Sequence, residues 1–133
     1  MIVVDASVLA NVIGDDGADG RRARGEIRIA GQVAAPDLVD VEAVAVLRKR
    51  WLAGTISESR FQAAVADLEQ LGISRYPTLP LMRRAFELRA NVTAYDASYV
   101  ALAELLGCEL LTGDGRLAGA TGPRCAIRLL RSS

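Results

Sequence analysis

Four acidic residues stand where a parallel α/β protein would bring them together: Asp5, Glu42, Asp96 and Asp114. Asp5 directly follows a short β-branched run, and Asp114 follows a second apolar run that ends at Thr112. Glu42 lies in the early turns of one predicted helix, and Asp96 opens another. Because ligands of open parallel sheets bind beyond the carboxyl ends of the strands, we expect these four side chains to share one site.

Such a site would favour metal-dependent hydrolysis. Carboxylates held close together repel each other, and their pKa values rise unless a cation neutralises the charge. Mg²⁺ and Mn²⁺ prefer oxygen ligands and keep several of their waters. An ion of this kind lowers the pKa of a bound water and stabilises charge on a phosphoryl oxygen. We therefore expect a hard divalent cation, Mg²⁺ or Mn²⁺, as the cofactor.

Each acidic residue also has a structural interpretation. Asp5 could cap the helix that follows it, Asp96 satisfies the N-cap preference of its own helix, and Asp114 lies in a Gly-Asp-Gly turn. Glu42 is harder to explain in this way, because its neighbours over Val41–Leu47 are otherwise apolar. A carboxylate there is costly unless it lies at an edge, is paired or binds a metal. The prediction of a shared acidic site therefore rests on the four residues together and not on any one of them.

The composition excludes several other chemistries. The 133 residues contain no histidine, which removes Ser-His-Asp and Cys-His catalysis, histidine bases and His-ligated zinc. Cys108 and Cys125 are the two cysteines, too few for a zinc cage or a disulfide framework, and free thiols fit a reducing cytoplasm. Sixteen acidic and sixteen basic residues balance, and 51% hydrophobic residues suffice for the core of one domain.

No secretory signal or membrane span is predicted. Met1 leads directly into Ile2–Asp5, without a basic region or a long apolar segment. The most apolar window, Val39–Leu47, is interrupted by Glu42 and is far shorter than a bilayer span. We expect a cytoplasmic protein with no membrane partner.

Strands and helices are predicted to alternate along the chain. The predicted strands are Ile2–Val4, Gln32–Pro36, Ile73–Tyr76, Glu109–Thr112 and Ala126–Leu130. The predicted helices are Ser7–Ile13, Arg21–Ile29, Asp37–Ala53 with Asp37 as N-cap, Ser57–Leu71, Pro80–Asn91 and Asp96–Leu106, with a loop over Asp15–Gly20. This order predicts an α/β fold with a mostly parallel central sheet and helices on both of its faces.

Four segments of the sequence resemble the PIN-domain ribonucleases, and specifically the VapC toxins of bacterial type II toxin–antitoxin modules. They are Ile2–Leu9, Pro36–Glu42, Ala94–Ala103 and Leu110–Leu117, and they occur in the family order at roughly the family spacing. The resemblance spans essentially the whole chain. It implies a single PIN domain over residues 1–133, with a three-layer α/β/α architecture.

The resemblance also implies a role for each site residue. Asp5 and Asp96 would be the principal metal ligands, and Glu42 and Asp114 would complete the acidic pocket directly or through water. The hydroxyls of Thr112 and Ser7 would support the site. Residues 115–122 contain no acidic residue, so the resemblance does not extend to a complete second metal site.

The implied activity is Mg²⁺-dependent endonucleolytic cleavage of RNA by a toxin that inhibits growth or translation. A metal-activated water would attack the phosphodiester and leave a 5′-phosphate and a 3′-hydroxyl. The resemblance further implies a cognate VapB-like antitoxin that blocks the site, a homodimer, and a toxin–antitoxin hetero-oligomer.

An acidic pocket repels RNA, so basic residues elsewhere must hold the RNA backbone. The candidates lie in two groups on predicted helices: Arg21, Arg22, Arg24 and Arg28, and the run Arg48, Lys49 and Arg50. The alternative is that both groups are solvated helix faces. Tyr95, Tyr99 and Trp51 are expected in the core or at an interface rather than as platforms for base stacking.

Two other classes of protein remain open. Residues 5–9 partly match the Asp-x-Ser-x-Ser metal-dependent adhesion site of von Willebrand A domains, although Leu9 stands at the last position. A catalytically inactive PIN-like scaffold is the second alternative. Metal-dependent cutting of RNA would separate both from the nuclease.

Overall fold

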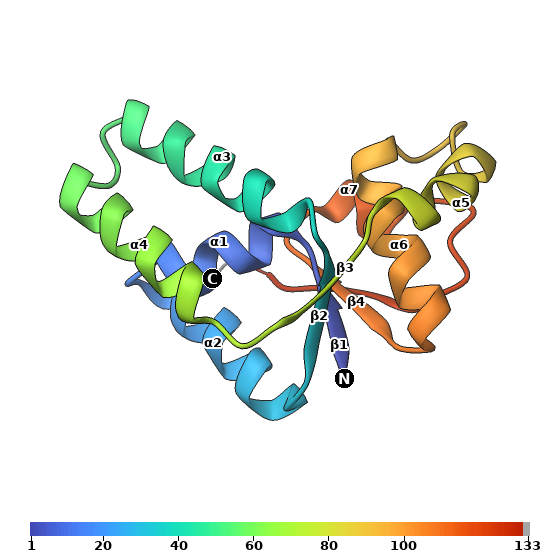
Figure 1. The fold of residues 1–133 in the computed structure, drawn as a ribbon, viewed down its shortest axis with the longest axis horizontal. Helices are drawn as coiled ribbons and strands as arrows, with labels where there is room; N and C mark the ends of the chain where they lie inside the picture. Colours follow the sequence, from blue (N-terminus) through green and yellow to red (C-terminus); the bar gives the residue numbers. More distant parts are fainter. Residues whose placement is uncertain (132–133) are drawn as a thin grey trace.

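The computed structural model describes residues 1–131, which fold around one five-stranded sheet (Figure 1). The strands are β1 (Ile2–Val4), β2 (Val33–Pro36), β3 (Ser74–Tyr76), β4 (Glu109–Thr112) and β5 (Ile127–Leu129). Their spatial order is β3-β2-β1-β4-β5, and every neighbouring pair is parallel. The sheet, expected to be mostly parallel, is parallel throughout the described residues.

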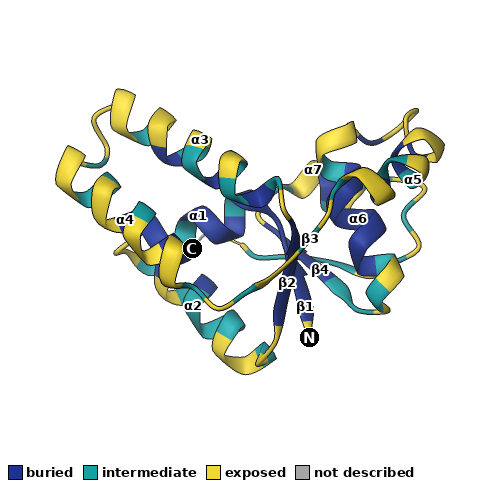
Figure 2. Ribbon diagram, in the orientation of Figure 1, coloured by how far each residue is buried: buried dark blue, intermediate teal, exposed yellow. Residues whose placement is uncertain are grey.

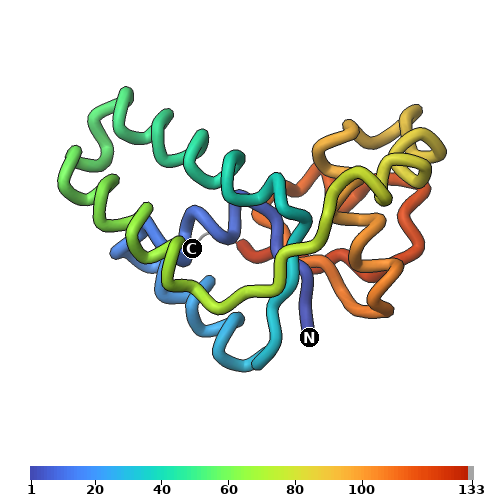
Figure 3. The backbone as a smooth tube through the Cα atoms, viewed as in Figure 1, coloured from blue at the N-terminus to red at the C-terminus, as the bar shows by residue number. Residues whose placement is uncertain are grey.

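Helices cover both faces of the sheet, as the alternation of elements predicted. The helices are α1 (Ala6–Gly14), α2 (Ala18–Ala30), α3 (Val39–Leu52), α4 (Glu58–Gln70), the 3₁₀ helix η1 (Leu79–Leu81), α5 (Met82–Glu87), α6 (Ala94–Leu106) and α7 (Gly115–Ala118). On one face α1 packs against α2, α3 and α4, and on the other α6 packs against α5 and the central strands. The trace in Figure 3 shows the two helical layers diverging at one end of the sheet. The three-layer α/β/α prediction is confirmed.

The core lies on both sides of β1 and β4. These strands run side by side, with Val3 opposite Leu110 and Val4 opposite Leu111, and all four side chains are fully buried (Figure 2). Helix α6 is buried over most of its length, so it is apolar nearly all round rather than along one stripe. None of the helices in residues 1–131 combines the length and the apolar character needed to cross a bilayer.

Two predicted helix caps are wrong. Helix α3 begins at Val39 after Leu38, and Asp37 does not cap it. The backbone N–H of Asp37 instead donates to the carbonyl of Tyr76 at 2.7 Å, and its carboxylate accepts the Thr78 hydroxyl at 2.6 Å. The β2–β3 pairing therefore continues past the end of β2 and takes Asp37 away from the helix.

The second error concerns α6, which begins two residues earlier than predicted. Thr93 is the N-cap, and its hydroxyl accepts the backbone N–H of Asp96 at 3.2 Å. Asp96 thus occupies the first turn of the helix, at the third position after the cap, where an acidic residue is favoured. Because Thr93 caps the helix, the Asp96 carboxylate is not needed for that purpose.

Other element ends also differ from the prediction. Helix α2 begins at Ala18, inside the expected loop, because the Asp15 carboxylate accepts the backbone N–H groups of Gly17 and Gly20. The expected helix Pro80–Asn91 is a 3₁₀ turn followed by α5, which ends at Glu87. The turn at Asp114 leads into α7, which was not predicted.

Candidate active site

The site forms at the carboxyl ends of β1 and β4. The register that places Val4 opposite Leu111 brings the next residues, Asp5 and Thr112, side by side, and the Asp5 backbone N–H donates to the Leu111 carbonyl at 3.2 Å. Asp5 also caps α1, because its Oδ1 accepts the backbone N–H of Val8 at 3.1 Å. The same side chain therefore begins the helix and faces the end of the sheet.

Two hydroxyl groups hold the Asp5 carboxylate and link it to the segment after β4. Ser7 Oγ donates to Asp5 Oδ1 at 2.6 Å and accepts the Gly113 N–H at 3.0 Å. Thr112 Oγ1 donates to Asp5 Oδ2 and accepts the Asp114 N–H at 3.0 Å. Each hydroxyl thus uses both its donor and an acceptor site, so Asp5 is fixed from two sides.

Asp5 is buried, with an exposed fraction of 6%. Burial raises its pKa above the usual range, against the opposing effect of the hydrogen bonds from Ser7, Thr112 and Val8. The backbone N–H of Ser7 also acts on this carboxylate and lowers its pKa. A cation at this site would therefore bind a carboxylate whose orientation the surrounding donors already fix.

Glu42 reaches the site from α3 and is held by α6. The Tyr99 hydroxyl donates to Glu42 Oε1 at 2.5 Å, and the Tyr99 side chain is almost fully buried at 1% exposure. Burial raises the pKa of Tyr99 far above its ordinary value, so the phenol keeps its proton and acts as a donor. The pKa of Glu42 is raised by burial first and then by the charges of Asp96 and Asp5, while the bond from Tyr99 opposes the rise.

Asp96 and Asp114 complete the acidic cluster. The half-buried Asp96 has its pKa raised by burial and then by the charges of Asp5 and Asp114, whereas Arg116 lowers it. Asp114 caps α7 by accepting the Arg116 N–H at 2.9 Å. The charges of Asp5 and Asp114 thus act on Asp96, and those of Asp5 and Asp96 act on Glu42, so the four predicted carboxylates lie within electrostatic reach of one another.

The chemistry of these donors fits a hard divalent cation held in an open site. Within residues 1–131, no three His, Cys, Asp or Glu side chains are arranged to enclose a metal ion by themselves. Mg²⁺ does not require such a cage, since it is commonly held by one or two carboxylates and keeps several waters. Oxygen ligands alone also match Mg²⁺ or Mn²⁺ better than zinc or copper. Asp5 and Asp96 could hold the ion, with Glu42 and Asp114 within reach of its waters.

All of the predicted RNA-binding residues lie on α2 and on the second half of α3. Several of them serve the fold: Arg24 donates to the Val12 and Asp15 carbonyls, and Arg50 donates to Asn11 Oδ1 at 2.7 Å. Arg22 bonds to Asp19 and to the Arg131 carbonyl. The exposed residues of the two groups are Arg21, Arg28, Arg48 and Lys49. RNA contact by either group stays a prediction.

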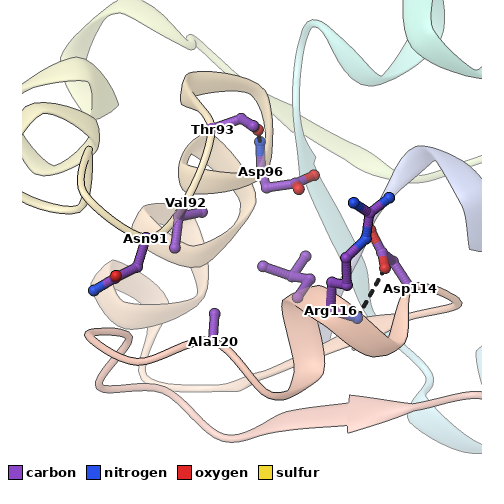
Figure 4. Close-up of a pocket in the computed structure, with 8 residues that line it drawn as sticks. Asn91, Val92, Thr93, Asp96, Asp114, Arg116 and Ala120 are labelled. Carbon is purple, nitrogen blue, oxygen red and sulfur yellow. Dashed lines mark hydrogen bonds between the residues drawn. The ribbon is translucent and has the colours of Figure 1, made fainter.

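Two residues beside the carboxylates were missed as parts of the site. Tyr99 was predicted only as a core or interface residue, and it is indeed buried. Its position three residues after Asp96 places both on one face of α6, which was the available signal. Arg116 gave no signal beyond its closeness to Asp114, and Figure 4 shows its side chain turned back toward Asp114 and Asp96. Tyr95 and Trp51, which were predicted in the core or at an interface together with Tyr99, are exposed, so a place in the core is wrong for both.

Comparison with known proteins identifies the family. The model of the PIN domain family matches residues 2–122. The chain belongs to the PIN domain family. It is 43% identical over 130 residues to Ribonuclease VapC1 of Mycobacterium tuberculosis, covering 97% of each chain, and 38% identical over 130 residues to Ribonuclease VapC9 of the same species, covering 98% of each.

A solved structure agrees with this membership. The crystal structure of PAE2754 from Pyrobaculum aerophilum matches with a TM-score of 0.68 at 26% identity, covering 95% of this chain and 81% of that one. The predicted resemblance of this PIN domain to the VapC ribonucleases is therefore confirmed, together with its fold class.

Proposed function

We propose that this PIN domain is an endoribonuclease toxin of the VapC type, which hydrolyses RNA phosphodiester bonds with the help of bound Mg²⁺. The observation that carries the proposal is the buried Asp5 carboxylate, fixed by Ser7, Val8 and Thr112 at the point where three further carboxylates converge. A chain without histidine needs another source of an activated nucleophile, and a metal-bound water is one.

Asp5 and Asp96 would hold the ion, and Mn²⁺ would replace Mg²⁺. When bound, the ion lowers the pKa of a coordinated water and neutralises charge on the phosphoryl group. The Ser7 and Thr112 hydroxyls keep Asp5 in one orientation, and Tyr99 does the same for Glu42. Because the nucleophile is water rather than the ribose 2′-hydroxyl, the products carry a 5′-phosphate and a 3′-hydroxyl.

The decisive experiment is cleavage of an end-labelled mixture of structured RNAs by the purified chain with Mg²⁺, Mn²⁺ or EDTA. Asp96→Asn is the test variant, and Asp67→Asn, on the exposed face of α4, is the matched control. We expect metal-dependent cutting that is lost in Asp96→Asn and retained in Asp67→Asn. A 2′,3′-cyclic phosphate product, or cutting that persists in EDTA, would contradict the mechanism.

The toxin role and its partners form a second part of the proposal. We expect expression in the cytoplasm to stop growth, and a VapB-like antitoxin to relieve the arrest by covering the carboxylates. We also expect a homodimer, which light scattering of the purified chain would detect. An arrest that persists in Asp96→Asn would show that growth inhibition does not come from this site.

The two alternative classes make different predictions. In the adhesion-type binding module, the last hydroxyl of the motif would stand at position 9, but Leu9 is fully buried in the core. That position can supply no ligand. An inactive scaffold would cut no RNA with either metal and would not stop growth.

A further inference from the structure

A pocket lies beside the carboxylates, between the turn that precedes α6 and the short helix α7 (Figure 4). Its volume is about 230 Å³, below the roughly 300–1,000 Å³ of pockets for drug-sized ligands. The apolar part of its wall is formed by Val92, Leu117 and Ala120, and Asp96 and Asp114 lie at its edge. Val92 and Leu117 are 7% and 3% exposed, so the pocket offers a narrow apolar surface to one small ring, directly next to the candidate metal ligands.

Arg116 adds a positive charge to this wall. Figure 4 shows its guanidinium beside the carboxylates of Asp96 and Asp114. Among the residues that the structure describes, this guanidinium forms no hydrogen bond or ion pair, whereas those of Arg60 and Arg84 are bound to carboxylates. The charge of Arg116 lowers the pKa of Asp96, but its guanidinium donors have no hydrogen-bond acceptor among these residues, so they can donate to a phosphate.

We infer that the pocket binds one nucleotide of the RNA substrate, with its base against Val92 and Leu117 and its phosphate on Arg116. This inference rests on the proposed function, since it places a part of the RNA beside the carboxylates. A nucleotide joins a flat ring, apolar on its faces and polar at its edge, to an anionic phosphate. Asn91 and Thr93 line the same pocket and supply amide and hydroxyl groups for the edge of the base.

The position of Arg116 has one competing explanation, as a counter-ion of Asp96 and Asp114 before a metal binds. The two roles predict opposite results for Arg116→Ala. Loss of a counter-ion would strengthen metal binding and leave RNA binding unchanged. Loss of a phosphate ligand would weaken RNA binding whatever the sequence and would reduce its dependence on salt.

The first experiment measures binding alone, by methyl and arginine side-chain NMR with Mg²⁺ present. The probes are the four nucleoside 5′-monophosphates and, as a ligand without a base, ribose 5-phosphate. We expect the nucleotides to shift the methyl signals of Val92, Leu117 and Ala120, and ribose 5-phosphate to shift only the Arg116 signals. The same shifts from ribose 5-phosphate as from the nucleotides, or no shifts at these methyl groups, would overturn the inference.

The second experiment measures RNA cleavage by two variants and their controls. Arg116→Ala removes the positive charge, and its control is Arg124→Ala, near the amino ends of β4 and β5. Ala120→Leu fills the pocket, and its control is Ala66→Leu, on the exposed face of α4. For Arg116→Ala we expect KM to rise roughly 10-fold and the slope of log affinity against log salt to fall by about 0.7, as for one phosphate contact on a single strand. Ala120→Leu should change which bases flank the cut.

The outcomes of these experiments distinguish a wrong assignment of the pocket from a wrong assignment of the nuclease activity. If the wild-type chain cuts RNA but Arg116→Ala and Ala120→Leu match their controls, the inference is wrong and the nuclease stands. If Arg116→Ala only strengthens Mn²⁺ binding, measured by calorimetry without RNA, Arg116 is a counter-ion and the inference is wrong. If the nucleotides shift the three methyl groups but no RNA is cut with any metal, the pocket is supported and the proposed activity is wrong.

Discussion

Replacing Tyr99 with Phe tests whether the buried phenol positions Glu42. The substitution removes one oxygen and keeps the ring, which is 1% exposed, so the core around α6 stays packed. What is lost is the 2.5 Å hydrogen bond to Glu42 Oε1. Bonds to charged groups contribute about 1.5–3 kcal/mol, and because Glu42 is only partly buried, water replaces part of this bond. We expect a stability loss of about 1 kcal/mol.

The effect on activity should exceed the effect on stability. Groups that orient metal ligands typically change metal affinity or activity by about 10- to 100-fold when removed, and Tyr99 is the hydrogen-bond donor to Glu42. We expect Tyr99→Phe to lower kcat/KM for RNA by about that factor and to raise the Mg²⁺ concentration needed for half-maximal rate. Tyr76→Phe, on the edge strand β3, is the matched control.

The pH dependence of the unfolding free energy gives a second test of Tyr99→Phe. The pKa of Glu42 lies above its ordinary value because of burial, and the Tyr99 bond limits the rise. A carboxyl group with a raised pKa in the folded state stabilises the fold at low pH, and that contribution is lost as pH rises through the folded pKa. Tyr99→Phe should therefore lose more stability than wild type between acidic and neutral pH, as urea unfolding would measure. Equal pH profiles together with unchanged kcat/KM would refute the positioning role.

Two further predictions concern the fold. A Cβ at Gly20 would lie 1.8 Å from the Asp15 carbonyl oxygen, whereas one at Gly25 in the same helix meets nothing within 4 Å. Urea unfolding should therefore show Gly20→Ala destabilised by at least 2 kcal/mol and Gly25→Ala stabilised by about 1 kcal/mol, and the same sign for both would refute the steric argument. Burial alone would raise the pKa of Glu104, but the two hydrogen bonds from Arg84 help to lower it overall. Glu104→Gln should cost about 1 kcal/mol at pH 7, a difference that should shrink as pH falls through the lowered pKa of Glu104, and a cost that did not change with pH would count against the ion pair.

The strands could be predicted from the sequence because their signal is local. The bounds of β1 and β4 were predicted to the residue, since short apolar runs that end in a polar residue mark buried parallel strands. The first residues of α3 and α6 were predicted less accurately, because more than one nearby residue could act as the N-cap. Asp37 resembles an N-cap, but pairing with the chain after β3 directs it to Thr78, a contact 41 residues away that no local pattern records.

The candidate site was predictable in its residue types but not in its connections. The structure brings the four predicted carboxylates together, and their role as metal ligands stays a prediction. The bonds that hold them run between distant segments: Thr112 to Asp5, Tyr99 to Glu42 and Gly113 to Ser7. These pairs depend on the β1–β4 register and on the packing of α6. Neither can be predicted for individual residues from the sequence pattern.

Asp5 shows why the structural and the functional interpretation of an acidic residue at a strand–helix junction are not alternatives. Its Oδ1 caps α1 through Val8, and the charge of the same carboxylate raises the pKa values of Glu42 and Asp96. Burial raises its pKa, so holding its charge there costs folding free energy in the absence of a cation. Asparagine caps helices as well as aspartate does but carries no charge. Asp5→Asn should therefore keep α1 through the bond from Val8, but its NH₂ group cannot accept the Thr112 hydroxyl. Added Mg²⁺ should raise the unfolding temperature of the wild-type chain and leave that of Asp5→Asn unchanged, and equal shifts in the two chains would refute the role of Asp5 as a metal ligand.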